Sequence, residues 1–502
     1  MARPVGIVDA VAARPRLRLA LIGLRALIAA FGAVVAYACV RSLTGDPAPE
    51  PALRAALYVL AGLGLALALA QLMPRRLALL TACVLPALGA AYLYEAVLAW
   101  RADAMWQWRF TAELRRLVAT VPNPAVQYSP INFSLLGAHL TLPNGDHVLP
   151  LGEVANARTL MCQEGDRPFT IFDSDSHGFN NPDAAWPDTT SQAPRIVLIG
   201  DSFAYGACVA PQDHFAASLR ARVPGTVNLS QGGNGPLLEL AALREYAAQL
   251  RPSYVFWFYD ENNDVYSIVE DLPSDLENEL KHPILKRYLD DRAFTQDLRR
   301  RQADINAALK RQSDHWIANR LRDDTPLNRV LLFLTAPQIR ALLPKRLALA
   351  SPWPARAMAA QSGRADPDQP DIVAVFRRIL ALAVAETRSF GGRFVFVSIP
   401  ALTRFCFGRD YQQRDAVLAA ARAEAAVVID LEADFHEAAK ADGAPALFAA
   451  RPCRGHFSER GYALVARRLH EFLDLEDGKL SLPRPGWART DDGRLVYAGG
   501  RR

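Results

Sequence analysis

The chain has 502 residues, of which 51% are hydrophobic and 22% are charged. This length supports more than one domain with a buried core, and the fraction of charged residues excludes a chain that is embedded in a membrane throughout. The formal net charge is only +5 and the arginines form no dense run, which argues against a nucleic-acid partner.

Three apolar stretches lie within residues 1–100, over residues 19–40, 52–73 and 77–100. Each is close to the roughly 20 residues that a helix needs to cross a bilayer. We therefore predict a membrane anchor of three transmembrane helices in contact with membrane lipid. A cleaved signal peptide is the alternative for the first stretch, but no clean cleavage site follows it and two more stretches do.

Basic residues orient this predicted anchor. They lie before the first stretch and between the second and the third, at Arg3, Arg14, Arg16, Arg18, Arg75 and Arg76. By the positive-inside rule both of these segments face the cytoplasm. Three spans then place everything after residue 100 on the far side of the membrane.

Residues 101–190 form a mixed, β-containing connecting segment. Apolar residues alternate on both sides of a turn signal at Pro143-Asn144-Gly145, which predicts a hairpin.

From about residue 191 to residue 480, strands alternate with helices. Short apolar runs predict strands at residues 195–199, 226–229, 254–259, 393–399 and 426–430. Helical periodicity appears between them, and a last helix is predicted from Glu459 to about Leu473. This alternation predicts an α/β domain in which helices cover both faces of a parallel sheet.

Two segments depart from this alternation of strands and helices. Residues 268–370 are charged and helical in period, which indicates a helical insertion that is either a solvated elaboration or a lid or wall of a substrate groove. The Arg- and Gly-rich tail, residues 481–502, is predicted to be loosely ordered.

Three consecutive predicted strands end in polar loops of small residues. Gly200-Asp201-Ser202 follows the first strand, Asn228 to Gly233 follows the second, and Asp260 to Asp264 follows the third. Ligands of open α/β sheets bind at the carboxyl ends of the strands. Any one loop is typical of an ordinary turn, but together they indicate a site at one sheet edge with Ser202 as a candidate nucleophile.

These blocks, with His456 in GHFSERGYALVARRL, resemble the SGNH superfamily, also called GDSL-type hydrolases, over roughly residues 150–270 and 390–475. The flanking sequences are similar to a bacterial branch whose members carry membrane-spanning segments at the N-terminus. The resemblance implies a three-layer flavodoxin-like fold without a cofactor. It also implies that Ser202 is the nucleophile, that His456 is the base, and that Gly233 and Asn263 stabilise the oxyanion.

One position departs from the family pattern. The family usually has an aspartate three residues before the histidine, and here that position is Cys453. The acid of a triad holds the histidine in the correct tautomer. Three alternatives stay open: a Ser–His dyad oriented by a backbone carbonyl, a substitute carboxylate such as Asp430 or Glu459, or loss of catalysis.

The part of the chain after residue 100 holds four cysteines, an even number that suggests disulfides in an oxidising compartment. We hypothesise a Cys162–Cys208 disulfide that ties the connecting segment to the loop beyond Ser202. A Cys406–Cys453 disulfide would fix the loop that bears His456. Four unrelated buried thiols are the alternative.

The resemblance and the predicted topology imply a bacterial inner-membrane protein with its catalytic domain on the periplasmic side. The expected function is a serine-dependent ester hydrolase that removes O-acetyl or similar acyl groups from envelope or exported carbohydrate. The alternatives are an O-acetyltransferase acting on a polysaccharide, a lipid-facing esterase, and a catalytically inactive binding or assembly component with envelope protein partners. The histidines lack metal-ligand spacing and the chain has no phosphate loop, so we expect no metal and no cofactor.

Overall fold

The computed structural model describes residues 86, 89–97, 104–127, 139–164, 167–186, 196–266, 273–325, 371–408, 413–425, 427–450, 454–491 and 493–498. The chain divides into two compact units. The first comprises Met1–Ala112 and Asn319–Arg364, and the second comprises Glu113–Ala318 and Ala365–Arg502. The fold and the candidate site described below belong to the second unit.

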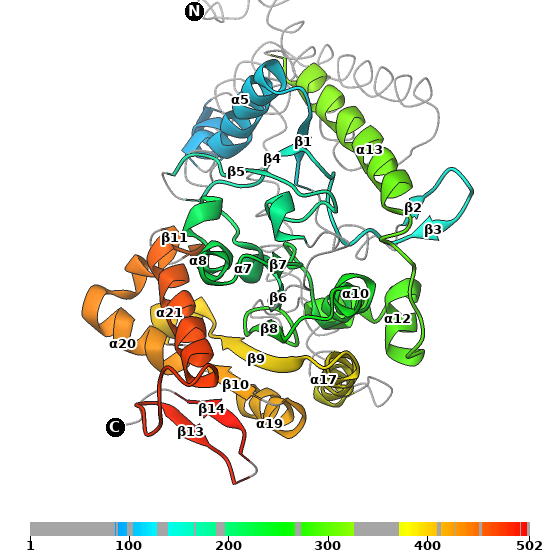
Figure 1. The fold of residues 1–502 in the computed structure, drawn as a ribbon. Helices are drawn as coiled ribbons and strands as arrows, with labels where there is room; N and C mark the ends of the chain where they lie inside the picture. The colour runs from blue at the N-terminus through cyan, green and yellow to red at the C-terminus, as the bar shows by residue number, and fades with distance from the viewer. Residues whose placement is uncertain are drawn as a thin grey trace, which may run out of the picture. The chain divides into compact units, whose positions relative to one another are not determined.

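A seven-stranded sheet with the order β13-β14-β10-β9-β8-β6-β7 forms the centre of this unit (Figure 1). Its strands are β6 (Ile196–Ile199), β7 (Thr226–Asn228), β8 (Tyr254–Asp260), β9 (Arg393–Ile399), β10 (Val427–Asp430), β13 (Trp487–Arg489) and β14 (Leu495–Tyr497). All neighbours are parallel except β13 and β14, which pair antiparallel. From β6 to β10 the strands are arranged in the order 2-1-3-4-5, so the predicted flavodoxin-like sheet is confirmed.

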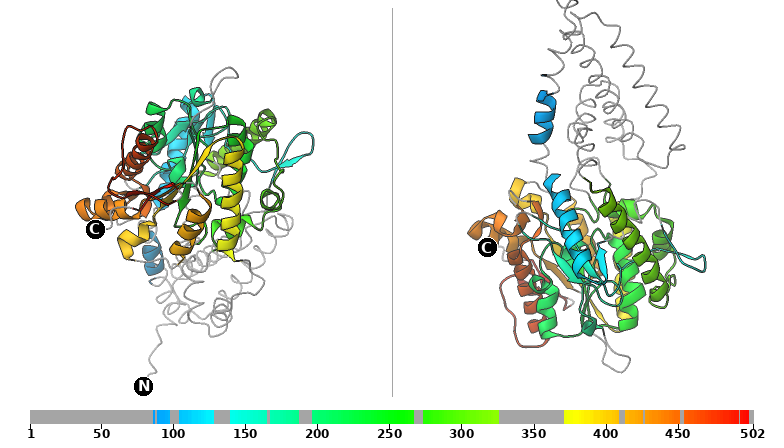
Figure 2. Two further views of the ribbon diagram at one scale, coloured as in Figure 1. Left: turned by 60° about the horizontal axis from the view of Figure 1, so that its bottom comes forward. Right: turned by 90° about the horizontal axis from the view of Figure 1, so that it is seen from above.

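Helices cover both faces of the sheet, and Figures 1 and 2 show α17 and α21 on opposite sides of it. One face packs against α9 (Pro236–Ala242), α10 (Ala248–Leu250), α17 (Ile372–Ser389) and α19 (Arg414–Glu424). The other packs against α8 (Phe215–Arg222), α20 (Glu432–Asp442) and α21 (Glu459–Glu476). Successive residues of β8 alternate between the two cores, with Val255 and Trp257 on one side and Phe256 and Phe258 on the other. β8 therefore carries apolar side chains on both of its faces, because both faces of the sheet are buried.

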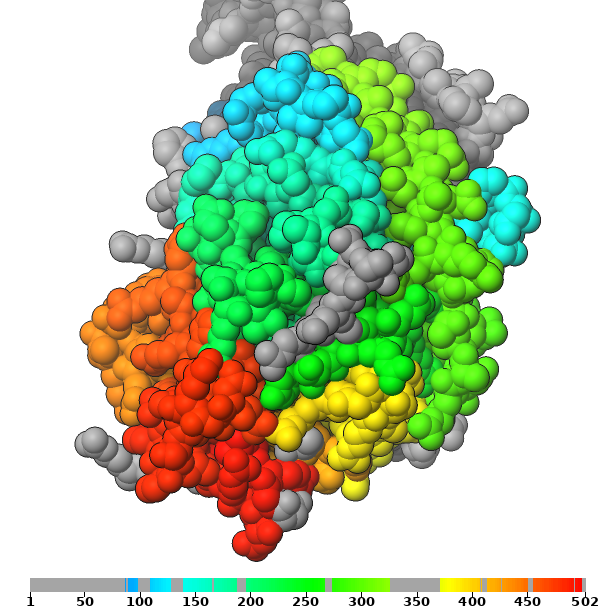
Figure 3. Space-filling model, viewed as in Figure 1, coloured from blue at the N-terminus to red at the C-terminus, as the bar shows by residue number. Residues whose placement is uncertain are grey.

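The connecting segment belongs to the second unit from Glu113 onward. It contains a three-stranded sheet of β1 (Pro124–Val126), β4 (Arg158–Leu160) and β5 (Ile171–Asp173). The hairpin predicted at Pro143-Asn144-Gly145 is confirmed as β2 (Leu140–Thr141) and β3 (His147–Val148). In the space-filling view this blue-green segment adjoins the green segment that follows β6 (Figure 3).

The side chain of Asn181 joins the connecting segment to the edge of the large sheet. Its Oδ1 accepts the backbone N–H of Asn228 at 2.8 Å, and its Nδ2 donates to the Asn228 carbonyl at 2.9 Å. The amide therefore occupies the place of a neighbouring strand beside β7, whose edge would otherwise hold unpaired backbone groups. Nδ2 also donates to Asp175 at 2.8 Å, so the junction belongs to a buried polar network.

The described part of the insertion contains α11 (Asp275–Glu279), α12 (Pro283–Asp290) and α13 (Gln302–Asp323), of which α13 belongs to the second unit up to Ala318. Glu279 on α11 accepts the backbone N–H groups of Gly235 and Leu237, and therefore caps the N-terminus of α9. The prediction of a loosely ordered tail is wrong for the strands β13 (Trp487–Arg489) and β14 (Leu495–Tyr497). There Val496 of β14 pairs with Val428 of β10, because an apolar strand can extend the exposed edge of a parallel sheet.

The three predicted membrane spans lie outside the described residues, apart from residue 86 and residues 89–97. Within the described ranges, no helix has both the length and the apolar character to cross a bilayer.

Replacing Asn181 by Leu is expected to destabilise the second unit by about 2–4 kcal/mol, because two buried backbone groups of Asn228 lose their partners. Urea unfolding of the purified protein measures this loss. The matched control is Asn144→Leu in the exposed hairpin turn, which should change the free energy of unfolding by less than about 1 kcal/mol. Equal effects of the two substitutions would contradict the role assigned to Asn181.

Candidate active site

Ser202 lies where β6 ends and the short helix α7 (Ser202–Tyr205) begins. Asp201 caps this helix, since its Oδ1 accepts the backbone N–H of Phe203 at 2.9 Å. Gly200 allows the sharp turn, because a Cβ atom there would lie 2.6 Å from the Ala204 Cβ. The turn presents the Ser202 hydroxyl at the carboxyl edge of the sheet, where the strand order reverses between β6 and β8.

The structure brings His456 to this serine across 254 residues of sequence. His456 lies on β12 (Arg454–Phe457), which pairs antiparallel with β11 (Phe448–Ala450). Its Nε2 is 2.8 Å from Ser202 Oγ, within hydrogen-bond reach of the proton that a base would remove. Asp201 Oδ2 is a second, longer contact of the hydroxyl, at 3.3 Å. The predicted pairing of Ser202 with His456 is thus present in the structure.

Glu164 of the connecting segment holds the other side of the imidazole. Its Oε1 is 2.8 Å from His456 Nδ1, and its Oε2 accepts the backbone N–H of His456 at 2.8 Å. One carboxylate therefore fixes both the ring and the backbone of the same residue. A proton on Nδ1 leaves Nε2 free to accept the proton of Ser202, which is the tautomer that a catalytic triad requires.

Electrostatics supports this arrangement. Burial alone would raise the pKa of Glu164, but the hydrogen bonds and charge of His456, with the charge of Arg167, bring that pKa below its ordinary value. Burial alone would lower the pKa of His456, but the hydrogen bond and charge of Glu164 outweigh it, so that pKa lies above its ordinary value. The pair thus consists of an ionised carboxylate beside a histidine whose protonated form is stabilised.

Two local features let Glu164 approach. Gly455 has a φ of 80°, and a Cβ atom there would lie 2.3 Å from Glu164 Oε2, so a side chain at this position would displace the carboxylate. The hypothesised Cys162–Cys208 disulfide is present, with Cα atoms 5.2 Å apart. It joins the segment two residues before Glu164 to the loop that follows α7.

Neither predicted substitute acid contacts His456 in the structure. The Asp430 carboxylate pairs with Arg414, with oxygen-to-nitrogen distances of 2.5 and 2.6 Å. Glu459 pairs with Arg167 at 2.6 Å. Glu459 lies three residues after His456 and Asp430 lies at the end of β10, but each carboxylate pairs with an arginine. These two residue assignments are corrected in favour of Glu164.

The two predicted oxyanion residues follow β7 and β8. Gly233 has a φ of 77°, in the left-handed region that favours glycine. The Asn263 Nδ2 donates to Asp275 Oδ2 at 2.7 Å, and the Asn263 backbone carbonyl accepts the backbone N–H of Asp275 at 2.9 Å. One hydrogen of this amide remains for a ligand. The oxyanion roles of Gly233 and Asn263 stay predictions.

Cys406 is disulfide-bonded in the structure, but Cys453 lies outside the described residues, so the Cys406–Cys453 pairing stays a prediction. One group of side chains that could hold a metal ion occurs in the described part of the chain. It comprises Glu164, Cys208 and His456, whose ligand atoms lie within 4.8 Å of one another.

The sequence reasoning missed Glu164, and one signal could have pointed to it. The acid lies two residues after Cys162, whose pairing with Cys208 was hypothesised, and Cys208 lies six residues after Ser202. A disulfide between these positions brings the residues after Cys162 close to the serine. A carboxylate in that short stretch was therefore a candidate.

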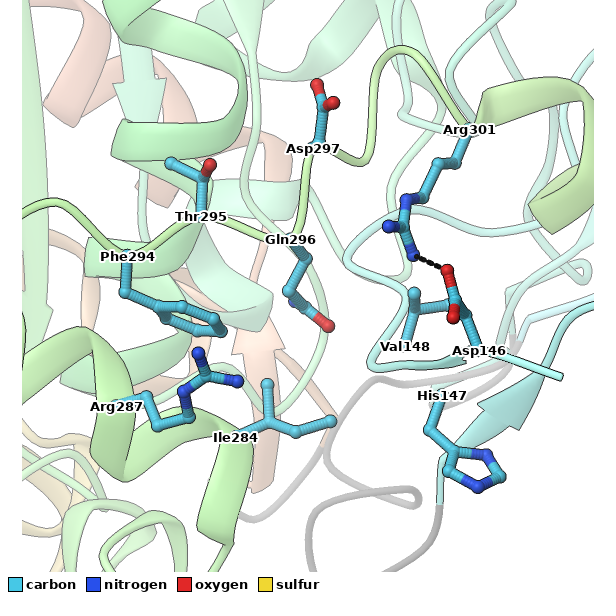
Figure 4. Close-up of a pocket in the computed structure, with 10 residues that line it drawn as sticks. All are labelled: Asp146, His147, Val148, Ile284, Arg287, Phe294, Thr295, Gln296, Asp297 and Arg301. Carbon is cyan, nitrogen blue, oxygen red and sulfur yellow. Dashed lines mark ion pairs between the residues drawn. The ribbon is translucent and has the colours of Figure 1, made fainter. Parts of the chain in front are cut away.

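A separate cavity of about 310 Å³ lies between the β2–β3 hairpin and the insertion (Figure 4). Figure 4 shows the Arg287 guanidinium over the Phe294 ring, 3.8 Å from its centroid, and Arg301 paired with Asp146 at 3.0 Å. The ten residues that line it include no histidine–serine pair. We therefore place the candidate active site at Ser202.

No protein-family model and no curated protein matches the sequence. Among solved structures, the chain is similar to the crystal structure of the lipase/acylhydrolase from Enterococcus faecalis, at 15% sequence identity and a TM-score of 0.28. The match covers 58% of this chain and 98% of that chain. At this TM-score the likeness supports no conclusion about fold or function. Both rest on the geometry described above.

Replacing Glu164 by Gln is expected to slow the reaction of Ser202 with a fluorophosphonate by about 10³–10⁴-fold, because the imidazole loses its orienting carboxylate. The rate of covalent labelling measures the effect. Glu459→Gln is the matched control. Glu459 pairs with Arg167 rather than with His456, so this substitution should leave the rate nearly unchanged. A normal rate in Glu164→Gln would show that His456 needs no acid.

The pH dependence follows from the raised pKa of His456. The base works only when Nε2 is unprotonated, so the labelling rate should rise with pH through an apparent pKa above the ordinary value of a histidine. Glu164→Gln removes the group that stabilises the imidazolium and should move this rise to lower pH. A rate profile with the same midpoint in both proteins would disprove the electrostatic coupling.

Proposed function

We propose that the protein is a serine-dependent enzyme that acts on ester bonds, as a hydrolase or an acyltransferase. The observation that carries the proposal is the continuous chain Glu164–His456–Ser202, in which both side-chain contacts measure 2.8 Å. A carboxylate, an imidazole and a hydroxyl in this order are the recurring means of activating a serine on unrelated folds.

The proposed reaction has two halves. In the first, His456 Nε2 takes the proton of Ser202 as Oγ attacks the ester carbonyl, and the protonated imidazole then gives that proton to the departing alcohol. The backbone N–H of Ser202, the N–H of Gly233 and the amide of Asn263 are proposed to hold the developing oxyanion. In the second half, water or a second hydroxyl group attacks the acyl-enzyme and releases Ser202.

Glu164 also bears on the alternative that the protein is catalytically inactive. The case for a catalytically silent binding or assembly component came from the absence of an aspartate at Cys453. Glu164 contacts His456 Nδ1, which is the contact that such an aspartate would make. The alternative therefore loses the feature that favoured it.

For the substrate, we propose O-acetyl or similar acyl groups on envelope or exported carbohydrate, as in a periplasmic enzyme held by an N-terminal membrane anchor. The family resemblance and the apolar stretches in residues 1–100 support this substrate class. An O-acetyltransferase shares the first half-reaction and differs only in its acceptor, a sugar hydroxyl in place of water. The His456 side chain is 24% exposed, so an acceptor can reach the base.

The first experiment is fluorophosphonate labelling of the purified protein beside Ser202→Ala and His456→Ala. We expect labelling of the wild type and none of the two variants, because the serine is inert without its base. Ser218→Ala, which changes the serine that contacts His470, is the matched control and should label normally. A folded wild-type protein that does not label would overturn the proposal.

Replacing Asn263 by Ala is expected to lower turnover of an acetyl ester by about 10²–10³-fold, the usual loss when one oxyanion donor is removed. The effect should fall on kcat rather than KM, since the interaction forms with the developing charge. Steady-state kinetics with an aryl acetate measures this division. Unchanged kcat would exclude Asn263 as an oxyanion donor.

A further inference from the structure

The Cys162–Cys208 disulfide lies directly against the proposed triad. The Cys208 sulfur, a Glu164 oxygen and a His456 ring nitrogen all lie within 4.8 Å of one another. Cys162 does not belong to this group, but its sulfur is bonded to the Cys208 sulfur. Three side chains of types that commonly bind zinc therefore converge on one small volume, and a fourth is bonded to one of them.

We propose that reduction of this disulfide converts the cluster of Cys162, Cys208, Glu164 and His456 into a Zn²⁺ site that competes with the proposed catalytic reaction. Thiolates, imidazole and carboxylate are the preferred ligands of zinc, and four of them complete a closed tetrahedral site. The inhibitory consequence rests on the proposed function, whereas metal binding itself does not.

The redox step is a two-electron reduction. A phosphine takes one oxygen from water and becomes a phosphine oxide, and the disulfide gains two electrons and two protons to give two thiols. Both thiols lose their protons as the metal binds. In the oxidised protein the sulfurs are bonded to each other and neither is a thiolate.

Three of the four side chains are already close to the spacing of zinc ligands, and Cys162 would move to join them. Zinc lies about 2.3 Å from sulfur and about 2.0–2.2 Å from nitrogen and oxygen, so its ligand atoms are a few ångströms apart. The Cα atoms of the two cysteines are 5.2 Å apart, which lets both sulfurs face one ion once they are no longer bonded. Glu164 is 17% exposed and His456 is 24% exposed, so an ion can enter from that side.

Zinc at this position would stop the proposed reaction through the tautomer of His456. Nδ1 faces Glu164, so the metal would replace the proton that Nδ1 now carries. A neutral imidazole bound through Nδ1 keeps its proton on Nε2 and becomes a donor toward Ser202. It can no longer accept the serine proton, and Glu164 no longer orients it.

The test uses Co²⁺, a spectroscopic substitute for Zn²⁺, on the full-length protein before and after reduction with tris(2-carboxyethyl)phosphine. We expect the visible absorption of tetrahedral, thiolate-bound Co²⁺ only after reduction, at one ion per chain. Ser202→Ala should bind like the wild type, because the serine is not a ligand, so this result holds even if the protein is not an esterase. Reoxidation should abolish binding, which shows the dependence without a substitution.

Variants separate this cluster from other cysteines. Cys162→Ser with Cys208→Ser, and His456→Ala, should remove the absorption. Cys406→Ser with Cys453→Ser is the matched control pair, and His436→Ala the matched histidine; both should keep it. Zn²⁺ should block fluorophosphonate labelling of the reduced protein and leave the oxidised protein unaffected. Equal Co²⁺ binding in both redox states, or absorption that persists in His456→Ala, would overturn the proposal.

Discussion

The contact on which the candidate site depends is the carboxylate of Glu164 against His456. Its two oxygens accept the ring Nδ1–H and the backbone N–H of the same residue, both at 2.8 Å. This fixes the position of the β12 backbone and the tautomer of the imidazole together. The partly buried setting strengthens the interaction, because less water competes for the carboxylate. Without it, His456 would lie near Ser202 with no group to orient its ring.

The connecting segment belongs to the site for the same reason. Glu164 can act only if its segment is held against the α/β domain, and several contacts do so. The disulfide to Cys208 is one, and the amide of Asn181 on the edge of β7 is another. A third is the Tyr205 hydroxyl, which donates to buried Glu153 at 3.1 Å three residues after the nucleophile. The segment and the domain therefore form a single packed unit around α7.

The sequence was informative where structure is determined locally. Short apolar runs predicted the five central strands, and the resemblance to the SGNH superfamily implied that Ser202 meets His456. Glu164 could not be found in this way, because 292 residues separate it from the histidine and its neighbours show no periodic pattern. The tail was misjudged for a related reason. Its composition suggested disorder, but Val496 lies in a short strand that is stabilised by the edge of β10.

A remote acid imposes different physical demands from a local one. An aspartate three residues before the histidine would share its loop and be positioned by the same turn. A glutamate on another segment must instead be ordered across the domain, which costs conformational entropy that the histidine loop cannot offset alone. A covalent link two residues away reduces that cost by restricting the segment before it folds. The glycine at position 455 completes the arrangement, since only a residue without a side chain lets the carboxylate reach the backbone N–H of His456.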